Sequence, residues 1–135
     1  MTPIRAIFDT NVFVGAGFNP QSASVRLLNA VSYGNFIQVW STETRAETQR
    51  ILDKIPPLDW EPFAKLFTAE GRYDGALDLA TASFVTDPED RKFAALSIST
   101  GAPIISSDHD LLCHTERLNV CKPGAFWQGF IEQIS

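Results

Sequence analysis

The stretch Ile4-Arg5-Ala6-Ile7-Phe8-Asp9-Thr10-Asn11, IRAIFDTN, decides the fold class of this chain. Its apolar part, residues 4–8, has the length and composition of a buried strand. The strand runs directly into the acidic residue Asp9. Carboxylates are rarely buried without a partner, so an acid at this point indicates a site rather than core packing. The sequence therefore predicts a buried first strand with a functional residue at its carboxyl end.

A second acid follows a second predicted strand near the C-terminus. Residues 103–106 are strand-like, and Asp108 comes two residues after them. In open parallel sheets, ligands bind beyond the carboxyl ends of the strands. Asp9 and Asp108 are therefore expected to project from the same edge of one sheet.

The rest of the chain alternates between short strands and helices of crossover length, which favours a parallel sheet covered by helices on both faces. We expect one α/β domain over residues 1–135. Further strands are predicted at 36–40, 84–85 and 119–121, and a loop at 15–21. Helices are predicted at 22–31, 42–55, 59–70, 76–80, 87–100 and from 123 to 134, with a turn or short helix at 111–112.

Two more acids, Glu47 and Asp90, lie on the apolar sides of predicted helices. Asp90 stands one turn before Phe93, on the side of its helix that faces the core. The nearby Asp87 precedes Pro88, which is a favoured first helical residue, so Asp87 is interpreted as an N-cap. Taken singly, Glu47 is interpreted as an ordinary exposed helix residue and Asp90 as a first-turn acid. Only the set of four acids is informative.

Convergence of the four acids would create a strong mutual repulsion, which a divalent cation removes. Mg²⁺ and Mn²⁺ prefer oxygen ligands, and such an ion activates water toward a phosphodiester. The sequence thus favours a metal-dependent hydrolase.

The pair Arg91-Lys92 either holds a phosphate group or forms a solvated helix face, and the second interpretation is favoured.

The overall charge does not favour a protein that coats nucleic acid. The chain of 135 residues has a net charge of −5, although four acids neutralised by metal would leave the remainder close to neutral and allow a local basic patch.

No apolar run is long enough to span a bilayer, and no secretion signal is evident, so we expect a cytoplasmic protein. Cys113 and Cys121, near His109 and His114, do not have a recognised zinc spacing and are interpreted as reduced thiols.

Four segments together resemble the PIN domain, and in particular the branch described as toxin components of toxin–antitoxin pairs. These segments are IFDTNVFV (7–14), STETRAETQRIL (41–52), DPEDRKFAALSISTGAPIISSDHDLL (87–112) and VCKPGAFWQGFI (120–131). They occur in the order of the family and span nearly the whole chain. A haloacid-type phosphatase is disfavoured because Asn11 stands where that class has a second aspartate, and a receiver domain is disfavoured because its acid pair and lysine are not evident.

The resemblance implies a three-layer α/β/α sandwich and an Mg²⁺- or Mn²⁺-dependent ribonuclease that forms no covalent intermediate. It implies a homodimer, an RNA substrate and a small antitoxin partner. The alternative is an inactive PIN-fold module that binds nucleic acid or protein. Segment 56–83 would be a variable helical arm whose aromatic residues belong to the core. By position, the resemblance implies catalytic and metal-binding roles for Asp9, Glu47, Asp90 and Asp108, supporting roles for Asn11 and Ser107, and a secondary acid at Asp110.

Overall fold

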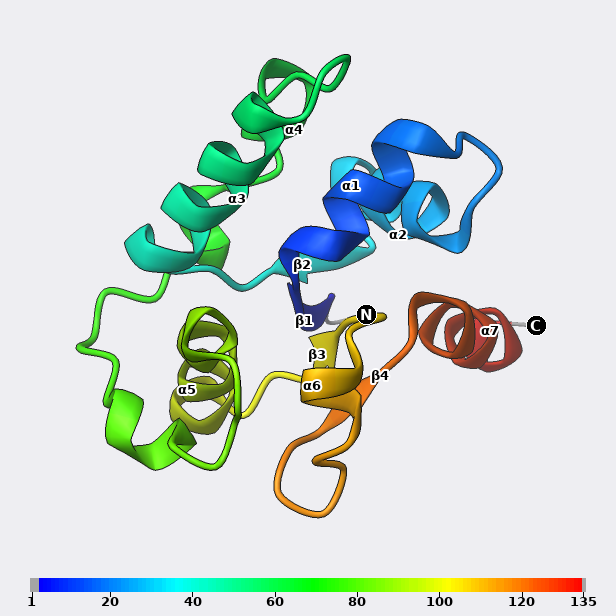
Figure 1. Ribbon diagram of the computed structural model, residues 1–135. Coiled ribbons are helices and arrows are strands. Elements are labelled where there is room, and N and C mark those ends of the chain that lie inside the picture. The colour runs from blue at the N-terminus through cyan, green and yellow to red at the C-terminus, as the bar shows by residue number, and fades with distance from the viewer. Residues whose placement is uncertain (1–2, 135) are drawn as a thin grey trace.

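The computed structural model describes residues 3–134 and places a four-stranded parallel sheet at the centre of the molecule (Figure 1). The strand order is β2-β1-β3-β4, so the strand that precedes Asp9 lies in the interior of the sheet and pairs with β3 on one side. The parallel sheet and the α/β class are as predicted. The strands are β1 (Ile4–Phe8), β2 (Phe36–Gln38), β3 (Ile104–Ile105) and β4 (Val120–Cys121).

Successive residues of the two central strands enter two different cores, because side chains alternate between the faces of a sheet. Ile7 and Ile104 pack into one core, while Phe8 and Ile105 pack into the other. All four of these side chains are buried. The continuous apolar runs of β1 and β3 are thus those of strands covered on both faces.

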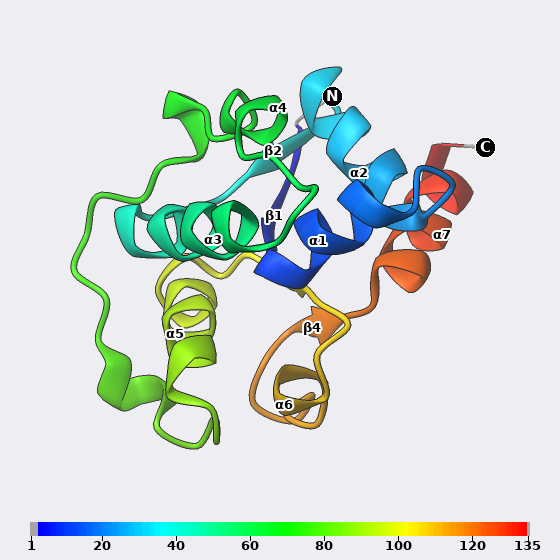
Figure 2. The same ribbon diagram turned by 45° about the horizontal axis from the view of Figure 1, so that its top comes forward.

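Helices cover both faces of the sheet, which gives the three layers that we expected (Figures 1 and 2). The core that contains Ile104 is completed by α5 (Arg91–Thr100) and α6 (His109–Leu112). The opposite core is completed by α1 (Thr10–Phe18), α2 (Ala23–Ser32), α3 (Thr42–Lys54) and α7 (Pro123–Ile134). Within residues 3–134, no helix has the length and apolar character that crossing a membrane requires.

Several predicted helix boundaries are confirmed by their caps. Ser22 accepts a hydrogen bond from the backbone of Val25, and Ser41 forms a capping box with Thr44 at the start of α3. Gly101 ends α5 in the left-handed conformation with a φ of 78°. These local signals are strong because each satisfies backbone groups that the helix leaves unpaired.

Other predicted elements were wrong. Helix α1 begins at Thr10 and covers most of the expected loop at 15–21, because Val12 and Phe13 bury an apolar face. The expected helix at 59–70 shrinks to α4 (Glu61–Ala64) and a 3-10 turn at Ala69–Gly71. Residues 84–85 form a turn rather than a strand, and the helix predicted at 76–80 is a 3-10 helix at Leu79–Ala82.

The segment after α4 packs against the edge of the sheet beside β2. Gln38 donates a hydrogen bond from Nε2 to the carbonyl of Leu66 at 2.9 Å, and Trp40 donates from Nε1 to that of Thr68 at 2.8 Å. The backbone N–H of Trp40 donates to the carbonyl of Gly71 at 3.0 Å. A side chain at Gly71 would overlap the carbonyl oxygen of Gln38, so this close approach requires glycine. Much of the segment thus runs along the sheet edge rather than forming the helical arm expected over 56–83.

We predict that Gly71→Ala destabilises the protein by about 1–3 kcal/mol, because the added methyl group forces the two backbones apart. Gly124→Ala is the matched control, since a side chain there meets open space on α7. Its effect is expected to stay within about 0.5 kcal/mol, as for other surface substitutions. Urea unfolding followed by tryptophan fluorescence measures both. Equal stability of the two variants would contradict the close approach at Gly71.

Candidate metal centre

Strands β1 and β3 bring Asp9 and Asp108 to the same edge of the sheet, as their positions in the sequence predicted. The backbone N–H of Asp9 donates to the carbonyl of Ile105 at 3.0 Å, which continues the strand pairing up to the acid. Ser106 Oγ donates to Asp9 Oδ2 at 2.7 Å and accepts from the Asp108 N–H at 2.9 Å. One hydroxyl therefore connects the ends of both strands.

The supporting hydroxyl belongs to Ser106 and not to the predicted Ser107. Ser106 is fully buried, whereas Ser107 is exposed. The other predicted supporting residue, Asn11, is exposed and lines the rim of the site. The one-residue difference matters because neighbouring residues at the end of a strand point to opposite sides.

Helix α3 brings Glu47 to this edge through its contact with α1. The hydroxyls of Thr10 and Thr48 form a buried hydrogen bond at 2.9 Å that joins the two helices. Thr10 follows Asp9 and Thr48 follows Glu47, so this pair fixes the two acids relative to each other. The Glu47 side chain is 10% exposed.

The turn before α5 positions Asp90. Asp87 accepts a hydrogen bond from the Glu89 N–H at 3.0 Å, which confirms the predicted N-cap. Arg91 Nε donates to the carbonyl of Val85 at 2.7 Å and holds the turn against the rest of the chain. Asp90 is only 8% exposed. Its Oδ2 atom is buried and has no hydrogen-bond partner among residues 3–134.

These elements surround an acidic cavity of about 290 Å³. All four acids that the sequence singled out line it, which places them around one site. Asp110 lies on the same side at the start of α6. The lining residues are Asp9, Thr10, Asn11, Glu47, Arg50, Ile51, Asp87, Glu89, Asp90, Phe93 and Asp108.

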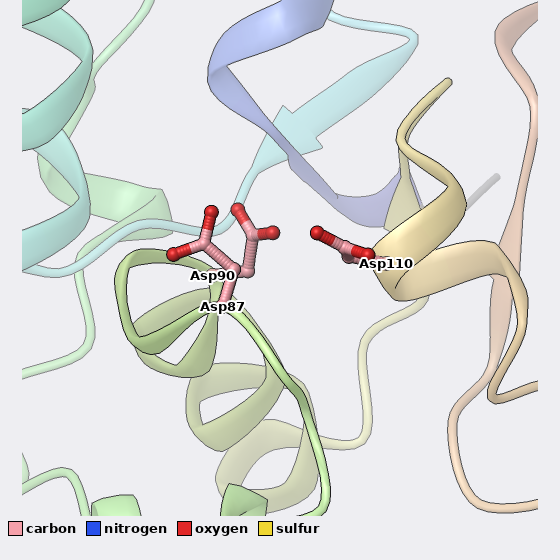
Figure 3. A group of neighbouring side chains, drawn as sticks. All are labelled: Asp87, Asp90 and Asp110. Carbon is pink, nitrogen blue, oxygen red and sulfur yellow. The ribbon is translucent and has the colours of Figure 1, made fainter.

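Beside this cavity, the carboxylates of Asp87, Asp90 and Asp110 form a close group. One oxygen from each lies within 4.8 Å of the others, a spacing compatible with ligation of one metal ion. Figure 3 shows Asp87 and Asp90 side by side in the turn before α5, with Asp110 facing them from α6. The donor set is entirely oxygen, as hard divalent cations prefer, and the unpartnered Asp90 Oδ2 fits an ion as its missing partner.

Burial and mutual repulsion raise the pKa values of two of the acids. Burial is the main cause that raises the pKa of Asp9 to about 6, with a smaller contribution from Asp108 and an opposing one from the Ser106 hydrogen bond. The pKa of Asp90 rises to about 8, first through burial and then through the charges of Asp9 and Asp108. The cavity thus holds protons near neutral pH that a divalent cation would displace.

Glu47 is engaged by basic side chains rather than by the aspartate cluster. Arg50 contacts both carboxylate oxygens of Glu47 at 2.8 Å, and Lys92 Nζ lies 3.2 Å from Glu47 Oε2. Lys92 also lies 2.9 Å from Glu89 Oε2. The interpretation of Arg91-Lys92 as a solvated helix face was therefore wrong, because Arg91 binds the preceding turn and Lys92 reaches across to α3.

The molecule is a parallel α/β/α sandwich, and acids converge at the carboxyl edge of its sheet. This combination is that of a candidate metal-dependent hydrolase. The family model for the PIN domain matches residues 5–110, and the chain belongs to the PIN-domain family. Members of this family are typically metal-dependent nucleases, and the acidic cluster is consistent with that class. No curated protein matches the sequence.

Four residues of the site were not assigned to it from the sequence. Ser106 was passed over for its neighbour, Asp87 was interpreted only as a cap, Lys92 was interpreted as solvated, and Arg50 was not singled out. The spacing of Asp87 and Asp90, three residues apart at a helix start, was an available signal because such residues share one face. The direction of Lys92 had no local signal, since it depends on how α5 packs beside α3.

We predict that the metal-free protein loses stability as the pH rises from about 5 to 8. The raised pKa values mean that the folded state holds protons which the unfolded state has already released, so unfolding becomes easier as the pH rises through the folded pKa values. Each pKa unit corresponds to about 1.4 kcal/mol, so the expected loss is on the order of 3–5 kcal/mol, most of it from Asp90. Urea unfolding in the presence of a chelator measures it.

Asp90→Asn is the informative control, because an amide cannot release the proton. The variant should show a clearly smaller decline over the same pH range. Asp53→Asn alters an exposed acid on α3 and should retain the full decline. If the free energy of unfolding of the unaltered protein stays constant or rises between pH 5 and 8, the raised pKa values of Asp9 and Asp90 are contradicted.

Proposed function

We propose that this protein is an Mg²⁺- or Mn²⁺-dependent endoribonuclease. The observation that carries the proposal is the gathering of the Asp87, Asp90 and Asp110 carboxylates at an acidic cavity on the carboxyl edge of the sheet, where the Oδ2 atom of Asp90 is buried without a hydrogen-bond partner among residues 3–134. An uncompensated buried oxygen costs free energy that a bound cation would recover. Membership of the PIN-domain family supports the same conclusion.

In this proposal, Asp9, Glu47, Asp90 and Asp108 form the catalytic set and hold the metal, and Asp87 and Asp110 complete its ligands. When bound, the cation lowers the pKa of a coordinated water molecule and stabilises negative charge on a phosphoryl group. Ser106 keeps the Asp9 carboxylate aimed into the cavity. Asn11 lies at the rim, where an RNA strand would enter.

The proposal extends to a biological setting. We propose that the nuclease acts in the cytoplasm as the toxin of a toxin–antitoxin pair, as a homodimer that a small antitoxin protein restrains. The sequence resemblance to that branch of the family supports this part. A short reading frame next to this one that encodes such a partner would be the simplest supporting observation.

We predict Mn²⁺-dependent cleavage of single-stranded RNA that Asp9→Asn lowers at least about a hundredfold, because the variant removes a buried anion from the centre of the site. Asp53→Asn makes the same chemical change at an exposed residue, and this variant should cleave RNA at the unaltered rate. Gel analysis of a labelled RNA measures both. Equal activity of Asp9→Asn would reveal a contaminating nuclease, and inactivity of the unaltered protein would support the alternative of a binding module.

Metal binding is measurable without any turnover. Calorimetry should detect Mn²⁺ binding that releases protons at pH 7, because Asp90 must ionise to coordinate the ion. Asp110→Asn should weaken binding, whereas Asp53→Asn should not. The absence of heat and of competition by chelators in the unaltered protein would refute the metal site.

A further inference from the structure

Two basic side chains at the acidic cavity, those of Arg50 and Lys92, share the carboxylate of Glu47. Arg50 is 46% exposed and Lys92 is 19% exposed, and both contact Glu47 Oε2, at 2.8 and 3.2 Å. Lys92 also pairs with Glu89, whose side chain is 60% exposed. The two basic side chains come from different helices, α3 and α5, and meet at one oxygen of Glu47.

This arrangement has the dimensions of a phosphate site. Two cations that contact one carboxylate oxygen are close enough to contact the oxygens of one phosphate group. Arginine and lysine are the usual partners of phosphates, the first through its planar fork and the second as a compact charge. Ion pairs with Glu47 and Glu89 already hold the two side chains in place, so little ordering is needed when a phosphate replaces these carboxylates.

The charge distribution directs an RNA strand to these two residues. Every charged side chain that lines the cavity is acidic except Arg50, and Lys92 is one contact away on Glu47. A polyanion that approaches the acids is repelled unless cations neutralise it. Arg91, by contrast, donates to the backbone carbonyls of Val85 and Thr86 and holds the turn in place.

We propose that Arg50 and Lys92 form a binding site for a backbone phosphate group of single-stranded RNA, next to the metal centre. The inference rests on the proposed function and adds the residues that hold the strand. If Glu47 held the metal ion, that carboxylate would no longer bind the two basic side chains, and they would be available to the phosphate. Glu89 competes with the phosphate for Lys92.

Fluorescence anisotropy of a labelled single-stranded RNA tests the site in the presence of Ca²⁺, with cleavage measured separately in Mn²⁺. Lys92→Ala and Arg50→Ala should each raise Kd about three- to tenfold and lower the slope of log K against log salt by about 0.7, the loss of one phosphate contact. Lys92→Arg should keep both values. Glu89→Gln should lower Kd about two- to threefold, because it removes the competing anion.

Lys54→Ala is the matched control, because it removes an equal charge from the exposed end of α3. It should leave the salt slope unchanged. Thermal unfolding of every variant separates loss of binding from loss of fold. If Lys92→Ala and Arg50→Ala remain folded and bind RNA with the unaltered Kd and slope, the phosphate site is refuted while the nuclease proposal stands.

The remaining outcomes are also decisive. An unaltered protein that binds RNA through these residues but does not cleave it supports the phosphate site and refutes the ribonuclease. A protein that neither binds nor cleaves RNA refutes both. If Lys92→Ala only strengthens Mn²⁺ binding and leaves RNA binding unchanged, Lys92 is a counter-charge for Glu47 and the phosphate site is refuted.

Discussion

The hydrogen bond from Ser106 Oγ to Asp9 Oδ2 is the contact on which the site depends. It joins residues that are 97 positions apart in the chain and lies at the carboxyl ends of the two central strands. The same hydroxyl accepts from the backbone of Asp108, so it orients the edge of the sheet as well as the carboxylate. A hydrogen bond to the charged form favours ionisation of Asp9 and opposes the cost of its burial.

Around this hydrogen bond, several carboxylates lie close enough to repel one another. Burial, followed by the nearby charges of Asp9 and Asp108, raises the pKa of Asp90 to about 8. Such an arrangement lowers the stability of the folded protein, and sites of this kind persist where a ligand compensates for them. Next to these acids, Arg50 and Lys92 form ion pairs with Glu47. The site thus has an acidic part and a part where basic side chains offset the acid, and the proposed attack on a phosphodiester would use both.

Much of the fold could be predicted from the sequence because its signals are local. The apolar run at residues 4–8 and the caps at Ser22, Ser41 and Asp87 each act within a few residues. The placement of Asp9 and Asp108 followed from the geometry of parallel sheets alone. Glu47 and Asp90 needed the family resemblance, because an acid on a helix is ordinary without knowledge of its neighbours.

The remaining features depend on tertiary packing. Whether Ser106 or Ser107 faces Asp9 depends on where β3 ends, and a shift of one residue exchanges the two. The segment around Gly71 follows the edge of β2, which overrides the helical pattern of its aromatic residues. Lys92 meets Glu47 only because α5 lies beside α3, and no pattern within either helix specifies that contact.

The central claim is that Asp90 shares a divalent cation with its acidic neighbours. The most direct measurement is a crystal structure of the protein soaked in Mn²⁺, with the ion located from its anomalous scattering. The account predicts an ion in direct contact with Asp90 Oδ2 and with an oxygen of Asp87 or Asp110. A cavity without an anomalous peak, with the Asp90 oxygen bound to a protein donor instead, would contradict it.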